Sequence, residues 1–404
     1  MSPAIIEAPP DEAALAGRIA AAHAAAEPLA VWGNRTKASL GRPVQAAAAV
    51  SSRALTGITL YSPAELVLSA RAGTPVAAIE VALAEKGQHL VAEPPDLSAL
   101  CGAEEGADGP STIGGAVACN LSGPRRIALG AMRDQVLGVR AVNGMGEVIT
   151  SGGRVLKNVT GLDLCKLLAG SRGTLAVMTE VTLKVLPAPE ATATIVLRGL
   201  GTEAAVAALS AGLGSPFGVT GAAHLPAEAA ARAGLGDGGA ATLLRIEEFA
   251  DFIPYRTGRL ADLLGAHGAA TVLDDAASRV LWRVVRDAAP LGVAAGEGVW
   301  RLSLRPSEGP RALALLAEAG LRGFLDWGGG LVWAAGAATE AAQAAVMAAA
   351  EGGVFWTVRA PAPLRAARPV VPPEPPALAA LTRRVKAAFD PKGILGPGRL
   401  FAGI

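Results

Sequence analysis

The chain has 404 residues, of which 51% are hydrophobic and 18% are charged, and its formal net charge at pH 7 is +1. This length and composition predict roughly two or three folded domains and exclude a disordered chain. A net charge near zero gives no indication of nucleic acid or an anionic membrane as a partner. The 3 cysteines are too few for an iron–sulfur cluster, which takes about four cysteine ligands.

The N-terminal segment carries acidic rather than basic residues, unlike a secretion signal. No apolar run reaches the length of about 18 residues that a membrane-spanning helix needs. We therefore expect a cytoplasmic protein that meets a membrane only indirectly, at its inner face through partner chains. The isolated histidines form no pair with metal-ligand spacing, so we expect no metal site.

In the N-terminal part of the chain, residues 12–26 predict an alanine-rich helix. Residues 28–33 predict a short strand that runs into a glycine turn. Residues 65–91 predict a strand, a helix and a second strand. Thr74 can cap this helix, Pro75 would stand at its first position, where proline is favoured, and Gly87 can end it.

Further along the chain, residues 135–151 predict a β-hairpin, and residues 174–189 predict a long alternating strand closed by two prolines. From 191 to about 360, strand and helix patterns alternate, which indicates an antiparallel sheet with helices on one face. A proline-rich connector over 360–377 precedes a final helix at 378–389.

These boundaries predict three parts of the chain. The first is a domain over 1–189 with subdomains at about 1–60 and 61–189, and the second is an α+β domain over 190–365. The third is a C-terminal segment over 366–404 that packs back on the first domain, since its glycine- and proline-rich tail still ends in apolar residues.

Two glycine-containing segments can hold an anion. The turn from Gly33 to Lys37 combines backbone N–H groups with Thr and basic side chains, although a solvated turn fits it equally well. Segment 111–126 is small and nearly neutral until Arg125 and Arg126, which can neutralise a phosphate or flavin anion or pair with carboxylates of this chain. A GxGxxG pattern at 234–239 follows a helix and precedes a strand, the wrong order for a dinucleotide fingerprint.

Several motifs occur together in a characteristic order. They are the strand and glycine turn, then "SPAELVLSARAGTP", "STIGGAVACNLSGPRR", "GAMRDQVLGVRAVNGMGEVITSGG", "KNVTGLDLCKLLAGSRGTLAVMTEVTLKVLP" and the closing "FDPKGILGPGRLF". In that order they resemble the FAD-binding oxidoreductases of the vanillyl-alcohol oxidase (PCMH-type) superfamily, and within it the E subunits of bacterial glycolate oxidases. The resemblance implies an α+β fold: a PCMH-type FAD-binding domain of two subdomains plus an α+β cap domain with an antiparallel sheet.

The resemblance also implies which residues contact the cofactor. The pyrophosphate loop, the flavin ledge, the adenosine side and the closing motif map onto Gly33, Asn34, Arg35, Thr36, Lys37, Thr112, Gly114, Gly115, Ala116, Ser122, Gly123, Gly173, Thr174, Val177 and Arg399. Family members with covalent flavin use a histidine in the first loop or a cysteine elsewhere. Histidine is absent from 31–42, so we expect FAD to be bound non-covalently.

The function implied is that of the FAD-binding subunit of a glycolate (2-hydroxy acid) oxidase complex, with a second flavin subunit and an iron–sulfur subunit as partners. One alternative is a self-sufficient FAD-dependent 2-hydroxy acid dehydrogenase, and another is a non-catalytic assembly subunit. We assign no catalytic residue and no nucleic-acid partner. Arg301, Arg305 and Arg359 lie on predicted strands of the second domain and are candidates for a carboxylate. Trp282, Trp327 and Trp333 mark either a partner surface or core packing.

Overall fold

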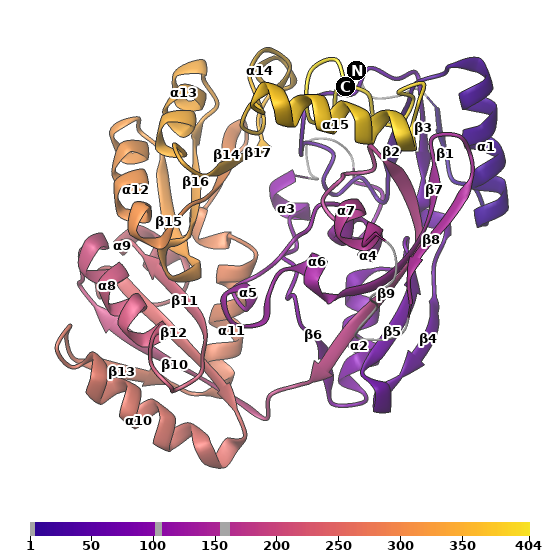
Figure 1. Ribbon diagram of the computed structural model, residues 1–404. Helices are drawn as coiled ribbons and strands as arrows, with labels where there is room; N and C mark the ends of the chain where they lie inside the picture. The colour runs from indigo at the N-terminus through magenta and orange to yellow at the C-terminus, as the bar shows by residue number, and fades with distance from the viewer. Residues whose placement is uncertain (1–4, 102–106, 154–161) are drawn as a thin grey trace. The chain divides into compact units, whose positions relative to one another are not determined.

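The computed structural model describes residues 5–101, 107–153 and 162–404 (Figure 1). The chain forms two compact units. The first unit comprises Met1–Leu121, Ala131–Ala188 and Pro373–Ile404, and the second comprises Ser122–Gly130 and Pro189–Pro372. None of the helices in the described ranges is both long and apolar enough to cross a membrane.

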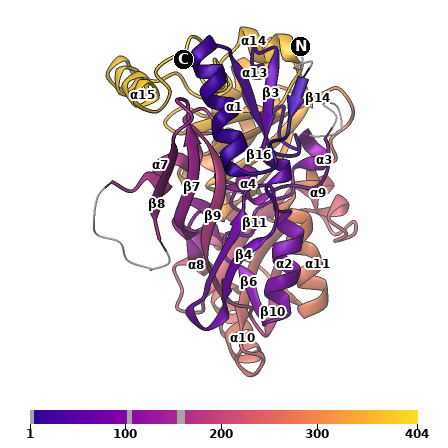
Figure 2. The ribbon, with the colours of Figure 1, turned by 90° about the vertical axis from the view of Figure 1, so that its right-hand side faces the viewer.

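The first unit begins with a small parallel sheet in the order β1-β3-β2, whose strands are β1 (Ile5–Glu7), β2 (Leu29–Trp32) and β3 (Ala48–Ser51). Helix α1 (Glu12–Ala25) starts where the Asp11 side chain accepts a hydrogen bond from the Ala14 backbone. Its buried residues Leu15 and Ile19 pack against Leu29 of β2, and Figure 2 shows α1 lying along this sheet.

A larger antiparallel sheet follows in the order β4-β5-β9-β7-β8, with β6 paired to the end of β9. Its strands are β4 (Ile58–Ser62), β5 (Val67–Arg71), β6 (Gln88–Leu90), β7 (Val136–Asn143), β8 (Val148–Gly152) and β9 (Ala176–Pro187). The predicted hairpin is confirmed as β7–β8 and the predicted long strand as β9, which pairs with both β5 and β7.

Apart from α1, the longest helix of the first unit is the C-terminal α15 (Pro376–Phe389). The shorter helices are α2 (Val76–Ala84), α3 (Ser98–Cys101), α4 (Ile113–Ala118), α6 (Met132–Gln135) and α7 (Leu164–Leu168). Single 3₁₀ turns lie at Ser52–Ala54 and Pro63–Glu65. Helices α2, α4 and α7 contribute to one core with β5, β7 and β9.

The second unit is built on an antiparallel sheet in the order β13-β10-β12-β11-β15-β16-β14-β17. Its strands are β10 (Ala191–Arg198), β11 (Val219–Leu225), β12 (Ala241–Glu248), β13 (Ala270–Leu273), β14 (Glu297–Ser303), β15 (Arg322–Asp326), β16 (Leu331–Ala337) and β17 (Val354–Arg359).

The helices of the second unit are α5 (Arg126–Leu129), α8 (Thr202–Leu213), α9 (Ala227–Arg232), α10 (Ile253–Leu264), α11 (Asp275–Arg286), α12 (Gly309–Glu318), α13 (Glu340–Ala349) and α14 (Ala362–Ala367). Its 3₁₀ turns lie at Ala250–Phe252, Ala289–Leu291, Pro306–Glu308 and Trp327–Gly329.

Helices cover both faces of the second unit's sheet, so the prediction that they lie on one face is wrong. Ile195 of β10 packs into the core that holds Leu209 of α8 and Leu260 of α10. The neighbouring Thr194 points to the other face, where it bonds to Ser278 on α11. Alternate residues of a strand face opposite ways, so one strand serves two helix layers. The predicted α+β class with an antiparallel second sheet is confirmed.

Candidate functional site

A pocket in the first unit lies where the end of β2, the start of α4, the start of β9 and the C-terminal tail meet. Its lining residues are Val31, Trp32, Gly33, Asn34, Arg35, Thr36, Lys37, Ser52, Ala72, Thr112, Gly114, Gly115, Ala118, Cys119, Arg172, Gly173, Ala176, Val177, Met178 and Arg399. Segments far apart in the sequence thus form one site.

The loop after β2 forms one wall of the pocket. Gly33 packs directly on Thr112, because a Cβ at this glycine would stand 2.6 Å from the threonine Oγ1. The Gly33 carbonyl accepts a hydrogen bond of 2.9 Å from the Ser51 hydroxyl. Arg35 then adopts a left-handed backbone with φ of 58°, which turns the chain between Asn34 and Thr36, and all three residues line the pocket.

Lys37 is a buried cation at this wall. Its Nζ donates hydrogen bonds of 3.0 Å to the Thr36 hydroxyl and 2.6 Å to the Ser111 hydroxyl. Burial lowers the pKa of Lys37 below that of an exposed lysine, although Cys119 nearby acts in the opposite direction. A desolvated ammonium group held by neutral hydroxyls is stabilised by an anion that binds beside it.

Two buried arginines add further positive charge to the pocket. Burial lowers the pKa of Arg172 to about 10; nearby Cys119 opposes this shift, and the neighbouring Arg399 adds to it. The Arg399 guanidinium lies 5.1 Å from the centre of the Trp32 ring. Its Nη2 donates a hydrogen bond of 3.4 Å to the Lys37 carbonyl. Like charges held together away from water favour a multiply charged anion between them.

Two of the pocket glycines are required by packing within the protein itself. A Cβ on Gly114 would stand 2.6 Å from the Ala72 Cβ, and a Cβ on Gly173 would stand 2.8 Å from Val31 Cγ1. Gly173 also has a φ of 76°, which L side chains rarely adopt. These glycines therefore let segments of the first unit approach one another, and this close approach shapes the pocket floor.

Most of the residues expected to contact the cofactor line this pocket. The exceptions are Ala116, Thr174, Ser122 and Gly123. Ala116 is buried inside the core that α4 shares with the larger sheet, and the Thr174 hydroxyl donates to the Ser171 carbonyl. Ser122 and Gly123 belong to the second unit, where the Gly123 carbonyl accepts from Trp327 Nε1 at 3.0 Å.

Several lining residues were not anticipated from the sequence, among them Trp32, Cys119 and Arg172. Arg172 directly precedes Gly173, which was expected to contact the cofactor. That position next to an expected site residue is the sequence feature that could have identified Arg172. The Trp32 Nε1 atom is buried and has no hydrogen-bond partner among the described residues. A buried indole N–H of this kind is a ready donor to a ligand.

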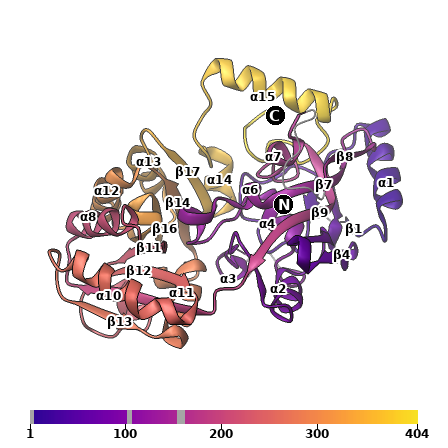
Figure 3. The same cartoon turned by 60° about the horizontal axis from the view of Figure 1, so that its bottom comes forward.

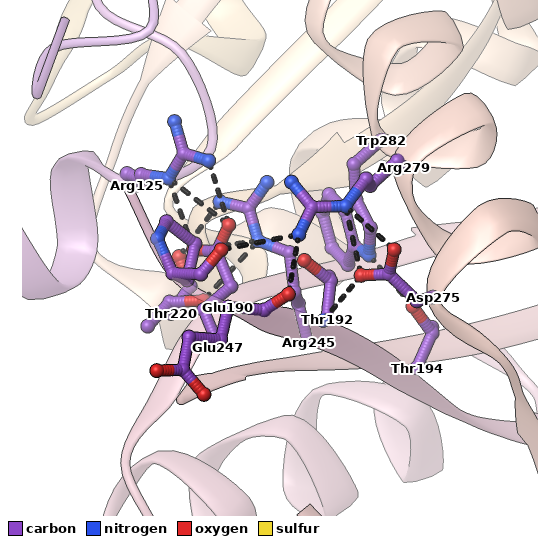
Figure 4. A network of polar contacts seen from close by, with 11 residues as sticks. Arg125, Glu190, Thr192, Thr194, Thr220, Arg245, Glu247, Asp275, Arg279 and Trp282 are labelled. Carbon is purple, nitrogen blue, oxygen red and sulfur yellow. Dashed lines mark hydrogen bonds and ion pairs between the residues drawn. The ribbon is translucent and has the colours of Figure 1, made fainter. Parts of the chain in front are cut away.

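In the second unit, Arg125 is committed to an ion pair (Figure 4). Its Nε and Nη2 donate to the Glu247 carboxylate at 2.6–3.2 Å, and Arg245 approaches the same carboxylate at 3.4 Å. Burial alone would raise the pKa of Glu247, but Arg245 and Arg125 outweigh it and hold the pKa well below its usual range. Of the two roles open to Arg125, the structure shows pairing with a carboxylate of this chain.

Trp282, Trp327 and Trp333 of the second unit are buried, and each has an arginine near its ring. Arg126 lies 4.6 Å and Arg301 4.7 Å from the centre of the Trp327 ring, and Arg301 is also 5.6 Å from that of Trp333. Trp282, Trp327 and Trp333 are at most 7% exposed. Of the two expected roles, partner surface or core packing, their burial shows core packing. Among the carboxylate candidates, Arg301 and Arg359 are buried, whereas Arg305 is exposed beyond β14.

Two family models match parts of the chain. Residues 3–152 match the FAD binding domain family, and residues 373–400 match the C-terminal domain of FAD linked oxidases. Two solved structures share the fold with a TM-score of 0.72: 4-ethylphenol oxidase from Gulosibacter chungangensis, at 12% identity over 98% of this chain and 89% of that chain, and p-cresol methylhydroxylase, at 13% over 98% and 88%.

The FAD-binding family match and the relatives, together with the shared fold, define an FAD-dependent oxidoreductase of the PCMH type, as the sequence resemblance implied. The glycolate oxidase subunit GlcE of Escherichia coli K12 is 32% identical over 93% of each chain, and the chain belongs to this family of subunits. A shorter match, 44% identical over 19% of this chain and 17% of its relative, is to a D-lactate dehydrogenase of Archaeoglobus fulgidus.

The residues of the pocket fit FAD. Its cations are Arg35, Lys37, Arg172 and Arg399, and no Asp or Glu stands among the described lining residues. The diphosphate of FAD carries the negative charge that such a set of cations stabilises.

Proposed function

We propose that this chain is the FAD-binding subunit of a glycolate (2-hydroxy acid) oxidase complex, in which electrons leave through an iron–sulfur subunit. The observation that carries the proposal is the acid-free, cationic pocket of the first unit in a chain related over nearly its whole length to a glycolate oxidase subunit. The D-lactate dehydrogenase relative supports the substrate class, because lactate and glycolate are both small 2-hydroxy acids.

Within this proposal, Lys37, Arg172 and Arg399 neutralise the FAD diphosphate, and the Trp32 Nε1 donates to the cofactor. When bound in this pocket, FAD would supply the redox chemistry, as the acceptor of a hydride equivalent from the substrate. The packing of Gly33 on Thr112 and of Gly173 on Val31 holds the loops that carry these cations in place before the cofactor arrives. Preorganised cations of this kind lower the cost of binding.

Oxidation of the substrate also needs a group that accepts the proton of its hydroxyl. The described lining residues of this pocket include no histidine or carboxylate for that role. His224 in the second unit is buried against Thr242 Oγ1 at 3.0 Å, and burial lowers its pKa to about 4. We propose that the acceptor comes from outside this pocket.

The test is to purify the chain alone, record its visible spectrum, and add glycolate or D-lactate without oxygen. We expect a flavin spectrum that persists with the isolated chain and bleaches once the second flavin subunit and the iron–sulfur subunit are present. Bleaching by the isolated chain at the full rate would instead establish a self-sufficient dehydrogenase. A purified chain without flavin, and unable to take it up, would establish an assembly subunit.

We also propose a cytoplasmic location, with membrane contact at the inner face only through the partner subunits. Fractionation of cells that contain or lack those subunits tests this. We expect the chain in the membrane fraction only when they are present, and its sedimentation with membranes in their absence would refute the proposal.

A further inference from the structure

An open apolar groove runs along helix α15 of the first unit. Figure 3 shows the course of α15, with the C-terminus and α7 labelled beside it. Its lining residues come from α7, the segment after it, α15 and the C-terminal tail, and are Leu167, Ala169, Gly170, Ser171, Thr174, Leu175, Leu378, Leu381, Thr382, Val385, Lys386, Leu400, Phe401 and Ile404. Leu381 is 52%, Leu378 48% and Leu167 38% exposed. Large apolar side chains gathered in one exposed groove are typical of a contact surface.

Only half of the apolar stripe on α15 is used inside this chain. Leu378, Leu381, Val385 and Phe389 recur at the spacing of a single helix face. Val385 and Phe389 pack against the core of the larger sheet, whereas Leu378 and Leu381 stay exposed over the groove. Helices in proteins gain most of their stability by burying such a stripe against another element. In the N-terminal half of α15, Leu378 and Leu381 are not buried in this way.

A buried ion pair anchors the other half of the helix. Lys386 Nζ donates hydrogen bonds of 2.7 Å to Asp390, 2.7 Å to the Thr174 carbonyl and 2.8 Å to the Leu395 carbonyl. These bonds join α15 to the start of β9 and to the C-terminal tail. The wall of the groove is therefore set by contacts within this chain, and the groove exists before any occupant binds.

The charge along α15 restricts what can bind. The helix contains Arg383, Arg384 and Lys386 and no acidic residue. Lys386 is paired with Asp390, while Arg383 and Arg384 are exposed. An occupant with an apolar face and acidic residues beside it would match the groove in both respects.

We propose that this groove binds an apolar, acid-flanked helix of another subunit of the same complex. This rests on the proposed function, in which the chain works with a second flavin subunit and an iron–sulfur subunit. The groove is lined by α7, α15 and the C-terminal tail, so a helix that lies in it would contact all three. A flat lipid surface would reach only the exposed ridge of α15, so a helix uses more of the available apolar surface.

The experiment co-expresses the full chain with those two subunits and measures their association by size-exclusion chromatography and by a binding titration. The test variant is Leu381→Glu, and the matched control is Val81→Glu on α2, a position that is 62% exposed in the same unit. We expect Leu381→Glu to weaken association at least tenfold while FAD content and Tm stay unchanged, and Val81→Glu to behave as wild type. Arg384→Glu leaves the apolar face intact and should weaken association about threefold at low salt.

Each result bears on the docking site. Wild-type association by both Leu381→Glu and Arg384→Glu would overturn the docking site and leave the proposed function standing. A wild-type chain that joins neither subunit would overturn the proposed function and the docking site with it. Two other results would also overturn the docking site. If Leu381→Glu abolishes binding to phosphatidylglycerol vesicles but leaves subunit association unchanged, the groove binds a lipid surface. If it abolishes a dimer of the isolated chain but leaves subunit association unchanged, the groove binds a second copy.

Discussion

Replacing Arg125 with Met should destabilise the second unit without removing FAD. The Arg125 guanidinium donates to both oxygens of Glu247, whose side chain is 6% exposed. Breaking a buried ion pair by removing one partner costs about 3–5 kcal/mol, because the other charge stays buried. Arg245 remains 3.4 Å from the same carboxylate and still compensates part of its charge, so we expect a smaller loss, about 2–3 kcal/mol.

For a unit of this size, such a loss lowers Tm by about 5–10 °C, which differential scanning calorimetry measures directly. The matched control is Arg259→Met, which removes an exposed pair at 3.6 Å with Asp262 and should cost at most about 0.5 kcal/mol. Glu247→Gln in the Arg125→Met background should recover about half of the loss by removing the buried charge. A Tm change under about 2 °C for Arg125→Met, or loss of FAD at an unchanged Tm, would refute this reasoning.

The same pair predicts the sign of the pH dependence. The arginines hold the pKa of Glu247 well below its usual range, despite the opposing effect of burial. The contribution to stability is therefore fully present above the unfolded carboxyl pKa of about 4.3 and is lost as pH falls below it. The difference in unfolding free energy between wild type and Arg125→Met should be largest near neutral pH and should shrink steadily below about pH 4.

Three further predictions concern the pocket of the first unit. Gly114→Ala should lower Tm and FAD occupancy, because its Cβ would stand 2.8 Å from the Ala72 carbonyl oxygen. In the control Gly17→Ala on α1, the new Cβ meets no atom within 4 Å, and the change should stabilise the protein by about 0.5–1 kcal/mol. Lys37→Met should raise the FAD Kd about 10- to 100-fold without lowering the Tm of the apoprotein, while the exposed Lys86→Met leaves both unchanged. Acid precipitation should release yellow FAD into the supernatant; colour that stays in the pellet would contradict non-covalent binding.

Local patterns predicted the elements on which the candidate site stands. Alternation of apolar residues indicated β9, a short apolar run before a glycine turn indicated β2, and turn residues indicated the β7–β8 hairpin. These signals depend on neighbours a few positions apart. Alternation cannot tell which helix covers which face of a sheet. For that reason the two-sided covering of the second unit's sheet, with Thr194 turned toward α11, was predicted wrongly.

The sequence by itself determined the glycine turns, the order of motifs and the family to which they lead. Only the tertiary structure decided how the cations are used, because their partners lie far away along the chain. Arg125 meets Glu247 more than a hundred positions later, and Arg172 joins Lys37 and Arg399 in one pocket. In segment 111–126, Gly114 and Gly115 line the pocket of the first unit, while Gly123 and Arg125 belong to the second unit, where Arg125 pairs with Glu247 of its sheet. A side chain's charge follows from its identity, but the group it neutralises is set by the long-range packing of the segments that carry it.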